Sequence, residues 1–231
     1  MFGNIYFFGY IVPVLLVSVI SYLMGCINTS IFITRVFKRG EDIRSMGSGN
    51  AGFTNTLRTL GKKMAILTFA GDFLKGVLAI LITMWILSFY PFIVSDFVTY
   101  KCVLWFAGSM CTIGHIYPCF FGFKGGKGIL TAWSVSLFVD WRVFLILISV
   151  FLIVFMLSRV VSLASVVAAI VYPVSTFLIT YFIDYKHLGH FYIYAFPTIC
   201  SLLMGILVLY KHRGNIRRLL SGQEGKITAH K

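Results

Sequence analysis

Glycines, hydroxyls, amides and cations gather in one polar stretch of the chain, residues 44–63. Glycine lets backbone N–H groups approach an anion closely, and hydroxyl and amide side chains add further donors. Thr54 and Arg58 are spaced so that a helix would present both on one face. The stretch is typical of an anion site, although an ordinary polar linker with glycine turns has a similar composition.

A second glycine-rich element, Phe123 to Gly128, holds two lysines around a pair of glycines. Backbone N–H groups and two ammonium groups could together bind a phosphoryl group. The spacing and the Lys-[Ser/Thr] ending of a Walker A loop are absent, so the element does not indicate ATP chemistry. A basic turn that only fixes membrane topology is the alternative. Just upstream, His115 is interpreted as a helix-end histidine that satisfies backbone carbonyls.

The third element lies near the C-terminal end, where His212 and Asn215 are spaced to lie together on a helix. A His–Asn pair at a membrane surface can orient a hydroxyl nucleophile, with the histidine as base or hydrogen-bond acceptor. A basic stop-transfer cluster is the alternative. Glu224 is the only acidic residue of this tail.

Asp72 and Lys75 form a further i, i+3 pair inside an apolar run, where we expect the two charges to neutralise each other. The sequence offers no Ser-His-Asp arrangement, no spacing typical of a metal site and no histidine–aspartate acyltransferase box. We therefore expect neither a metal nor another cofactor, and no covalent enzyme intermediate.

The composition predicts a membrane protein. Of the 231 residues, 59% are hydrophobic and only 12% are charged, and the mean hydropathy is +0.92. A soluble domain would have no place for so much apolar surface. The net charge of +13 is then explained by membrane topology and by attraction of anionic headgroups or substrates, and no nucleic-acid partner is expected.

Runs of about 20 apolar residues, the length that spans a bilayer, fall roughly at 7–34, 64–90, 100–121, 129–157, 160–183 and 190–210. The first run lacks the basic start of a signal peptide and is interpreted as a retained helix. Most of the 20 Lys and Arg lie in the breaks 35–63, 122–128 and 158–159 and in the tail after 210. By the positive-inside rule these segments face the cytoplasm.

An even number of crossings must then separate the break at 122–128 from the tail. The run 129–157 therefore has to divide at Asp140-Trp141-Arg142. Its first piece, residues 129–139, would rise only about 17 Å, so it must either thin the bilayer locally or lie behind other helices. The sequence predicts an all-α polytopic protein of about seven transmembrane helices in a single domain, 1–231, with the N-terminus outside and the C-terminus cytoplasmic.

Taken together, the three polar elements resemble the bacterial acyl-phosphate:glycerol-3-phosphate acyltransferases, the PlsY family. The resemblance runs from about Gly25 to Ile227 in one register. The matching residues include Gly47-Ser48-Gly49-Asn50, Thr54-Asn55, Arg58, Lys124-Gly125-Gly126-Lys127-Gly128, His212, Asn215 and Glu224.

The resemblance implies transfer of a fatty acyl group from acyl phosphate to the 1-hydroxyl of glycerol 3-phosphate, giving lysophosphatidic acid at the bacterial cytoplasmic membrane. It also implies membrane lipids as partners, and a soluble enzyme that makes the acyl phosphate. Ser48, His212 and Asn215 are expected to be catalytic. The expected phosphate- and substrate-binding residues are Asn50, Thr54, Asn55, Arg58, Lys124, Gly125, Gly126, Lys127, Gly128 and Glu224.

The first element departs from the family pattern at Ala51 and Phe53, and Asn28 stands where the family usually has proline. Phe53 adds bulk beside the glycines and bears on substrate fit. Two other classes of protein remain as alternatives. A transporter of organic phosphates would usually show paired repeats and broken helices at the midplane, and a lipid-binding scaffold would show no turnover.

Overall fold

The computed structural model describes residues 7–226 and has helices, turns and loops but no strand over that range. Six of its helical segments are long and apolar enough to cross a membrane: Phe8–Phe37, Lys62–Leu87, Phe97–Phe121, Trp141–Ser158, Val161–Leu188 and Tyr192–Lys211. One shorter apolar helix, Ile129–Val139, completes the set in this part of the chain. The all-α membrane architecture expected from hydropathy is confirmed.

The chain divides into two compact units, Met1–Val139 and Asp140–Lys231, called here the N-terminal and C-terminal units. The elements of the N-terminal unit are, in order, η1 (Phe7–Ile11), α2 (Val12–Cys26), α3 (Thr29–Phe37), η2 (Ile43–Ser45), α4 (Phe53–Leu60), α5 (Lys62–Leu87), α6 (Pro91–Val94), α7 (Phe97–Ile116), η3 (Cys119–Phe121) and α8 (Ile129–Val139).

Helices α2, α5, α7 and α8 form the body of the N-terminal unit. Helix α2 packs on both α5 and α7, and α8 packs on α5 and α7. The backbones of α2 and α7 touch, because a Cβ added to Gly114 would collide with the carbonyl oxygen of Tyr22. Glycine at such a crossing is a common way for membrane helices to pack closely.

Helix α8 has 11 residues, a rise of about 17 Å. Most of its residues are buried, so the short segment lies behind other helices of its unit. It ends at Val139, and Asp140 then caps α9 by accepting a hydrogen bond from the Arg142 N–H at 3.1 Å. The division of the 129–157 run at Asp140 is confirmed.

The C-terminal unit contains α9 (Trp141–Ser158), α10 (Val161–Ile179), η4 (Thr180–Tyr185), α11 (Lys186–Leu188), α12 (Tyr192–Lys211) and α13 (Arg213–Leu220). Helix α10 packs against both α9 and α12. The guanidinium of Arg142 bridges Asp140 and Asp184 at 2.7 and 2.8 Å, which joins the start of α9 to η4.

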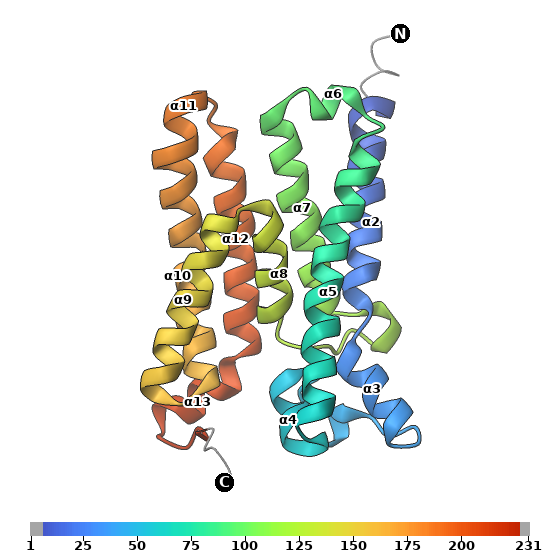
Figure 1. Ribbon diagram of the computed structural model, residues 1–231, viewed down its shortest axis with the longest axis vertical. Helices are drawn as coiled ribbons and strands as arrows, with labels where there is room; N and C mark the ends of the chain where they lie inside the picture. The colour runs from blue at the N-terminus through green and yellow to red at the C-terminus, as the bar shows by residue number, and fades with distance from the viewer. Residues whose placement is uncertain (1–6, 227–231) are drawn as a thin grey trace. The chain divides into compact units, whose positions relative to one another are not determined.

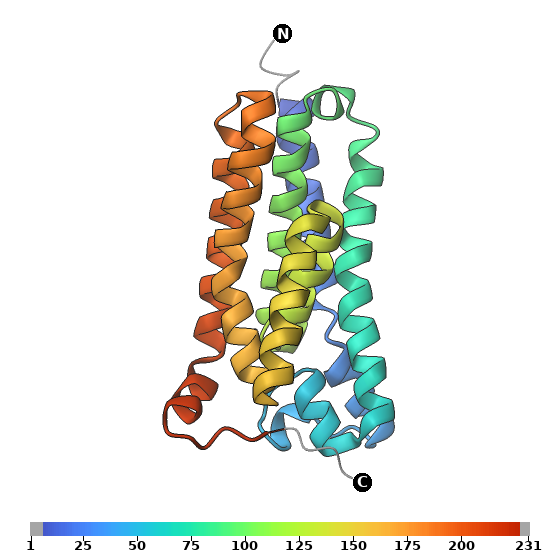
Figure 2. The ribbon, with the colours of Figure 1, turned by 60° about the vertical axis from the view of Figure 1, so that its left-hand side comes forward.

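Each unit places its basic segments at one end. In the N-terminal unit, α3, α4 and the loop after η3 lie at one end, and α6 lies at the other (Figures 1 and 2). In the C-terminal unit, α13 lies at one end and α11 at the other (Figure 1). Inside each unit, the segments that charge assigns to the cytoplasm therefore share an end.

Candidate active site

The first polar element contains a loop whose backbone is held by hydrogen bonds to one buried side chain. Asn55, on α4, is 1% exposed. Its Oδ1 accepts a hydrogen bond from the Ser48 N–H at 2.9 Å, and its Nδ2 donates to the carbonyls of Ile43 at 3.2 Å and Met46 at 3.0 Å. The amide expected to bind substrate is thus engaged with the loop, and it fixes the backbone that presents Ser48.

Four other predicted site residues of this element face outward or partly outward. Ser48 and Arg58 are exposed, and Asn50 and Thr54 are partly exposed. None of these four side chains has a hydrogen-bond or ion-pair partner within residues 7–226. Helix α4 begins after Gly52 without a side-chain cap, so its first N–H groups follow this loop directly and have no side-chain acceptor at the cap. Uncapped N–H groups beside donors and a cation suit an anion.

The second element is anchored differently from the prediction. The N–H groups of Gly125 and Gly126 donate to the carbonyls of Ile116 and His115, both at 3.1 Å. They are therefore not the free backbone donors expected to cradle a phosphate. Glycine is required here by close approach, because a Cβ on Gly126 would collide with Nε2 of His115 and lie 2.6 Å from the Ala51 carbonyl.

The cationic groups of the second element remain suited to a phosphate. The Lys124 side chain is exposed and has no partner in the described part of the chain. Lys127 is partly buried, and Gly128 has a φ of +87°, a left-handed conformation that favours glycine. The loop thus offers ammonium groups ahead of the start of α8, with its own backbone turned toward α7.

Arg44 joins the two elements. Its Nη1 donates to the carbonyls of Phe121 at 2.6 Å and Lys124 at 3.1 Å. Nε and Nη2 bind the two oxygens of Asp42 at 3.0 and 2.8 Å. These bonds hold the pKa of the Asp42 carboxyl below its ordinary value and raise that of the Arg44 guanidinium. Arg44 begins the polar stretch 44–63, and the sequence pattern predicted no role for it.

Behind the two elements lies a buried cluster of Asp72, Lys75 and His115. The ammonium of Lys75 is 2.8 Å from Oδ1 of Asp72, so the expected mutual neutralisation is confirmed. His115 was expected to satisfy helix-end carbonyls. Its Nδ1 lies 2.8 Å from Nζ of Lys75, a contact across 40 residues of sequence that spacing alone does not reveal.

The third element lies in the C-terminal unit, where His212 ends α12 and precedes α13. The ring is 3% exposed, and Nδ1 is 2.8 Å from the Val208 carbonyl. Because a carbonyl oxygen only accepts, Nδ1 bears the proton of this bond, and Nε2 bears the lone pair of the neutral ring. This tautomer suits a histidine that acts as a base through Nε2.

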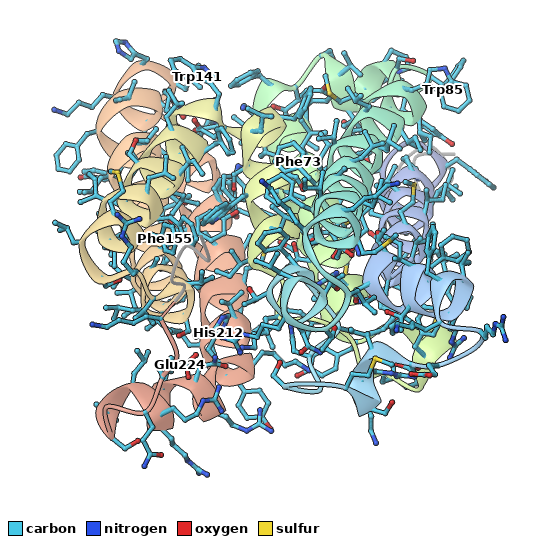
Figure 3. The ribbon with its side chains drawn as sticks, turned by 60° about the horizontal axis from the view of Figure 1, so that its bottom comes forward. Phe73, Trp85, Trp141, Phe155, His212 and Glu224 are labelled. Carbon is cyan, nitrogen blue, oxygen red and sulfur yellow. The ribbon has the colours of Figure 1, made fainter. Side chains whose placement is uncertain are left out.

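Glu224 fastens the tail to the rest of the C-terminal unit. Its Oε1 accepts from Asn215 at 2.7 Å and from Ser162 at 2.8 Å, and its Oε2 accepts from Arg218 at 2.6 Å. Figure 3 shows His212 and Glu224 at the same end of this unit. Asn215 was predicted to face a hydroxyl together with His212, and in the structure its Nδ2 donates a hydrogen bond to this carboxylate.

The electrostatics of Glu224 follow from these bonds. Burial alone would raise the pKa of Glu224, but the hydrogen bonds from Arg218, Asn215 and Ser162 outweigh that effect and lower it. Ser162 lies far away in the sequence, at the start of α10, and no sequence signal pointed to it. Arg218 is close enough in sequence for its pairing with the only acid of the tail to have been predicted.

Known proteins of one description match most of this chain. The family model described as glycerol-3-phosphate acyltransferase matches residues 15–222. A glycerol-3-phosphate acyltransferase of Aquifex aeolicus is 40% identical over 210 residues, which cover 91% of this chain and 97% of that protein. One of Bartonella henselae is 37% identical over 213 residues, covering 92% and 90%.

A crystal structure of PlsY (YgiH), an integral membrane glycerol 3-phosphate acyltransferase in its glycerol 3-phosphate form, superimposes with a TM-score of 0.72. It is 38% identical, and the match covers 93% of this chain and 96% of that one. The lysophosphatidic acid form gives the same TM-score, 0.72, at 35% identity. The chain therefore belongs to the family of integral membrane glycerol-3-phosphate acyltransferases.

Proposed function

We propose that this protein transfers a fatty acyl group from acyl phosphate to the 1-hydroxyl of glycerol 3-phosphate. The products are lysophosphatidic acid and inorganic phosphate, and the reaction is the first step of membrane phospholipid synthesis. The family membership supports the acceptor, and the solved glycerol 3-phosphate and lysophosphatidic acid forms of a relative support an acceptor and product of this kind.

The observation that favours acyl phosphate as the donor is the pairing of two basic elements by Arg44. Its guanidinium connects the first element, residues 44–63, to the Lys124 carbonyl of the second one and to the Phe121 carbonyl just before it. A reaction between two phosphorylated substrates needs two anion sites, and cations must offset the repulsion between the phosphates. One phosphate would bind near Ser48, Asn50, Thr54 and Arg58, and the other near Lys124 and Lys127.

The proposed chemistry is a direct transfer. The hydroxyl oxygen of glycerol 3-phosphate attacks the acyl carbonyl carbon, and the bond from that carbon to the phosphate oxygen breaks. The phosphate leaves with the bonding electrons, and the hydroxyl proton passes to Nε2 of His212 or to a substrate phosphate oxygen. A mixed anhydride is already activated, so this step uses neither ATP nor a thioester.

The remaining predicted residues are assigned supporting roles. We assign Asn55 to hold the first element, and Gly125, Gly126 and Gly128 to let the second one pack close to its neighbours. We assign Asn215 to orient the acceptor beside His212, with Glu224 fixing the tail. In this proposal the two units act as a single catalytic domain, 1–231.

The proposed setting is the bacterial cytoplasmic membrane, with the N-terminus outside and the C-terminus in the cytoplasm. The gathering of basic segments at one end of each unit supports this orientation. The acyl phosphate would be delivered by a soluble enzyme that makes it on the cytoplasmic side. Membrane lipids would surround the apolar faces and take up the product.

The test is a donor comparison with the purified protein in nanodiscs. We expect lysophosphatidic acid from acyl phosphate and glycerol 3-phosphate, and none when acyl-CoA replaces the acyl phosphate. Turnover with acyl-CoA alone would overturn the donor assignment. Counterflow of labelled glycerol 3-phosphate in proteoliposomes without any acyl donor would favour the transporter, and no turnover with either donor would favour the scaffold.

A further inference from the structure

Helix α5 buries two opposite charges inside a membrane-spanning segment. Asp72 is 2% exposed and Lys75 is 4% exposed, and both lie in Lys62–Leu87, a helix apolar enough to cross a bilayer. Charges in such helices are costly, and they usually mark functional sites. A buried pair adds little net stability compared with apolar residues of similar volume. Mutual neutralisation explains how the helix can bury the two charges, but it does not explain why they are present.

The ammonium of Lys75 contacts three separate parts of the N-terminal unit. Besides Asp72, it donates to the carbonyl of Ile27 at 2.7 Å and reaches Nδ1 of His115 at 2.8 Å. Ile27 is the C-cap of α2, just before α3, and His115 lies in the last turn of α7. An ammonium has three N–H donors, and all three have a partner here. Lys75 therefore fixes α5, the α2–α3 junction and the end of α7 relative to one another.

The contact with Lys75 also fixes the tautomer of His115. An ammonium can only donate, so Nδ1 of the histidine accepts, and the proton of the neutral ring is on Nε2. This Nε2 edge lies against the second polar element, since a Cβ on Gly126 would collide with it. The same Cβ would lie 2.6 Å from the Ala51 carbonyl in the first element. The ring edge therefore lies where the two elements meet.

We infer that Lys75 and His115 are positioning residues that set the spacing between the two phosphate-binding elements. Asp72 neutralises the ammonium, Lys75 orients the imidazole, and the imidazole supports Gly126 beside Ala51. An apolar side chain could fill the same space, but it could not fix the direction of the ring. The inference rests on the proposed reaction, because only a reaction between two bound phosphates depends on that spacing.

A change of spacing should affect the rate more than the binding of either substrate. Each phosphate would keep its own cations, whereas the distance from the hydroxyl to the acyl carbon would change. A misplacement of about 1 Å can lower the rate about 10²-fold. We therefore expect kcat to fall about 10²-fold when the cluster is broken, with KM for both substrates changing less than about threefold.

The experiment uses the full-length protein in nanodiscs and the charge-balanced double variant Asp72→Asn/Lys75→Met. Removing both charges avoids an unpaired buried ion, which would itself destabilise the fold. We expect a wild-type melting temperature, wild-type KM values and the loss in kcat given above. Thr83→Val is the matched control, because it removes a buried hydroxyl of the same helix that bonds to Ala79 and Ser21 away from the cluster.

Two histidine variants provide a second test if the double variant does not fold. His115→Gln places an amide near the Nε2 position, and His115→Asn places one near the Nδ1 position. We expect His115→Gln to keep a kcat several-fold above that of His115→Asn, since the Nε2 edge supports the element at Gly126.

Three results are distinguishable. Wild-type kcat in the folded double variant, or in both histidine variants, would overturn the inference. A rise in KM with an unchanged kcat would also overturn it, because it would place the cluster in substrate binding. A wild-type protein that does not turn over acyl phosphate would instead overturn the proposed function.

Discussion

The N–H of Ser48 donates a hydrogen bond to Oδ1 of Asn55 at 2.9 Å, so a buried residue of α4 positions an exposed residue of the preceding loop. The same amide donates to the carbonyls of Ile43 and Met46. One side chain thereby satisfies three backbone groups of the first polar element, and the shape of that element depends on it.

Asn55→Ala should therefore lower both stability and activity. The two carbonyls would lose their donor, and each unsatisfied buried group costs about 1–3 kcal/mol. Asn55→Asp should not restore function, since a carboxylate can accept from Ser48 but cannot donate to a carbonyl. Melting temperature and initial rates measure the two effects.

Thr59→Val is the control for Asn55, because it removes only the bond from the Thr59 hydroxyl to the Asn55 carbonyl at 2.8 Å. Its rate should stay close to that of the wild type. An Asn55→Asp protein with full activity would show that the two donated bonds are dispensable.

Arg44→Lys should impair catalysis although the charge is kept. A lysine ammonium cannot span Asp42, the Phe121 carbonyl and the Lys124 carbonyl as the planar guanidinium does. Bonds to a charged group are worth about 1.5–3 kcal/mol, so kcat/KM should fall about 10- to 100-fold. Steady-state kinetics with each substrate varied in turn measures this.

Arg35→Lys is the matched control, since Arg35 makes one ion-pair contact, a longer one of 3.4 Å to the same Asp42. Its guanidinium also lies over the Phe121 ring at 5.2 Å, and a lysine ammonium can make that cation–π contact as well. It should leave kcat/KM nearly unchanged. Equal losses in the two variants would indicate that both arginines act only through the overall positive charge.

Hydropathy and charge were sufficient to predict the helical spans, because both are properties of contiguous residues. The division of the chain at Asp140 followed from the same reasoning, since a basic break and a basic tail must face one side. The composition alone also marked out the three polar elements. What they bind in the folded chain was not predictable in the same way.

The missed contacts share a physical cause. Arg44 and the N–H groups of Gly125 and Gly126 bind backbone carbonyls, and every residue has a carbonyl, so no side-chain pattern marks the partner. Lys75 and His115 belong to different helices, and their pairing depends on how those helices pack.

The Glu224 anchor should make the stability of the tail depend on pH. Hydrogen bonds keep the folded pKa of this carboxyl below its ordinary value of 4.5. The unfolded chain therefore takes up the proton first as the pH falls. The stabilisation is present above about pH 4.5 and is lost as the pH falls through the lower folded value.

The measurement is the difference in melting temperature between the wild type and Glu224→Gln. We expect this difference to be largest at neutral pH and to shrink below about pH 4.5. Glu41→Gln is the control, because Glu41 is exposed and its side chain has no partner within residues 7–226. A difference for Glu224→Gln that is constant with pH would contradict the anchoring role of the charge.

The proposed orientation predicts which segments are reachable from outside the cell. In a background without the five natural cysteines, we expect a membrane-impermeant maleimide to label His190→Cys in intact cells. Lys38→Cys and Gln223→Cys should react only after the membrane is opened. Labelling of Lys38→Cys from outside would place the first polar element on the wrong side for a cytoplasmic donor.

His212 offers a way to identify the base of the proposed reaction. Its Nδ1 bond to the Val208 carbonyl leaves Nε2 as the basic nitrogen of the neutral ring. Gln at this position can form a hydrogen bond to the substrate hydroxyl but cannot take its proton. If His212 is the base, kcat of His212→Gln should fall about 10²- to 10⁴-fold, with KM for glycerol 3-phosphate nearly unchanged.

If a phosphate oxygen of the substrate takes the proton instead, His212 only orients the hydroxyl, and His212→Gln should retain most of the wild-type kcat. His187→Gln is the control, because His187 is exposed in α11 at the other end of the C-terminal unit. It should be as active as the wild type. Since both substitutions replace a ring by an amide, a loss confined to His212→Gln would come from its place beside α13 and not from the loss of an imidazole as such.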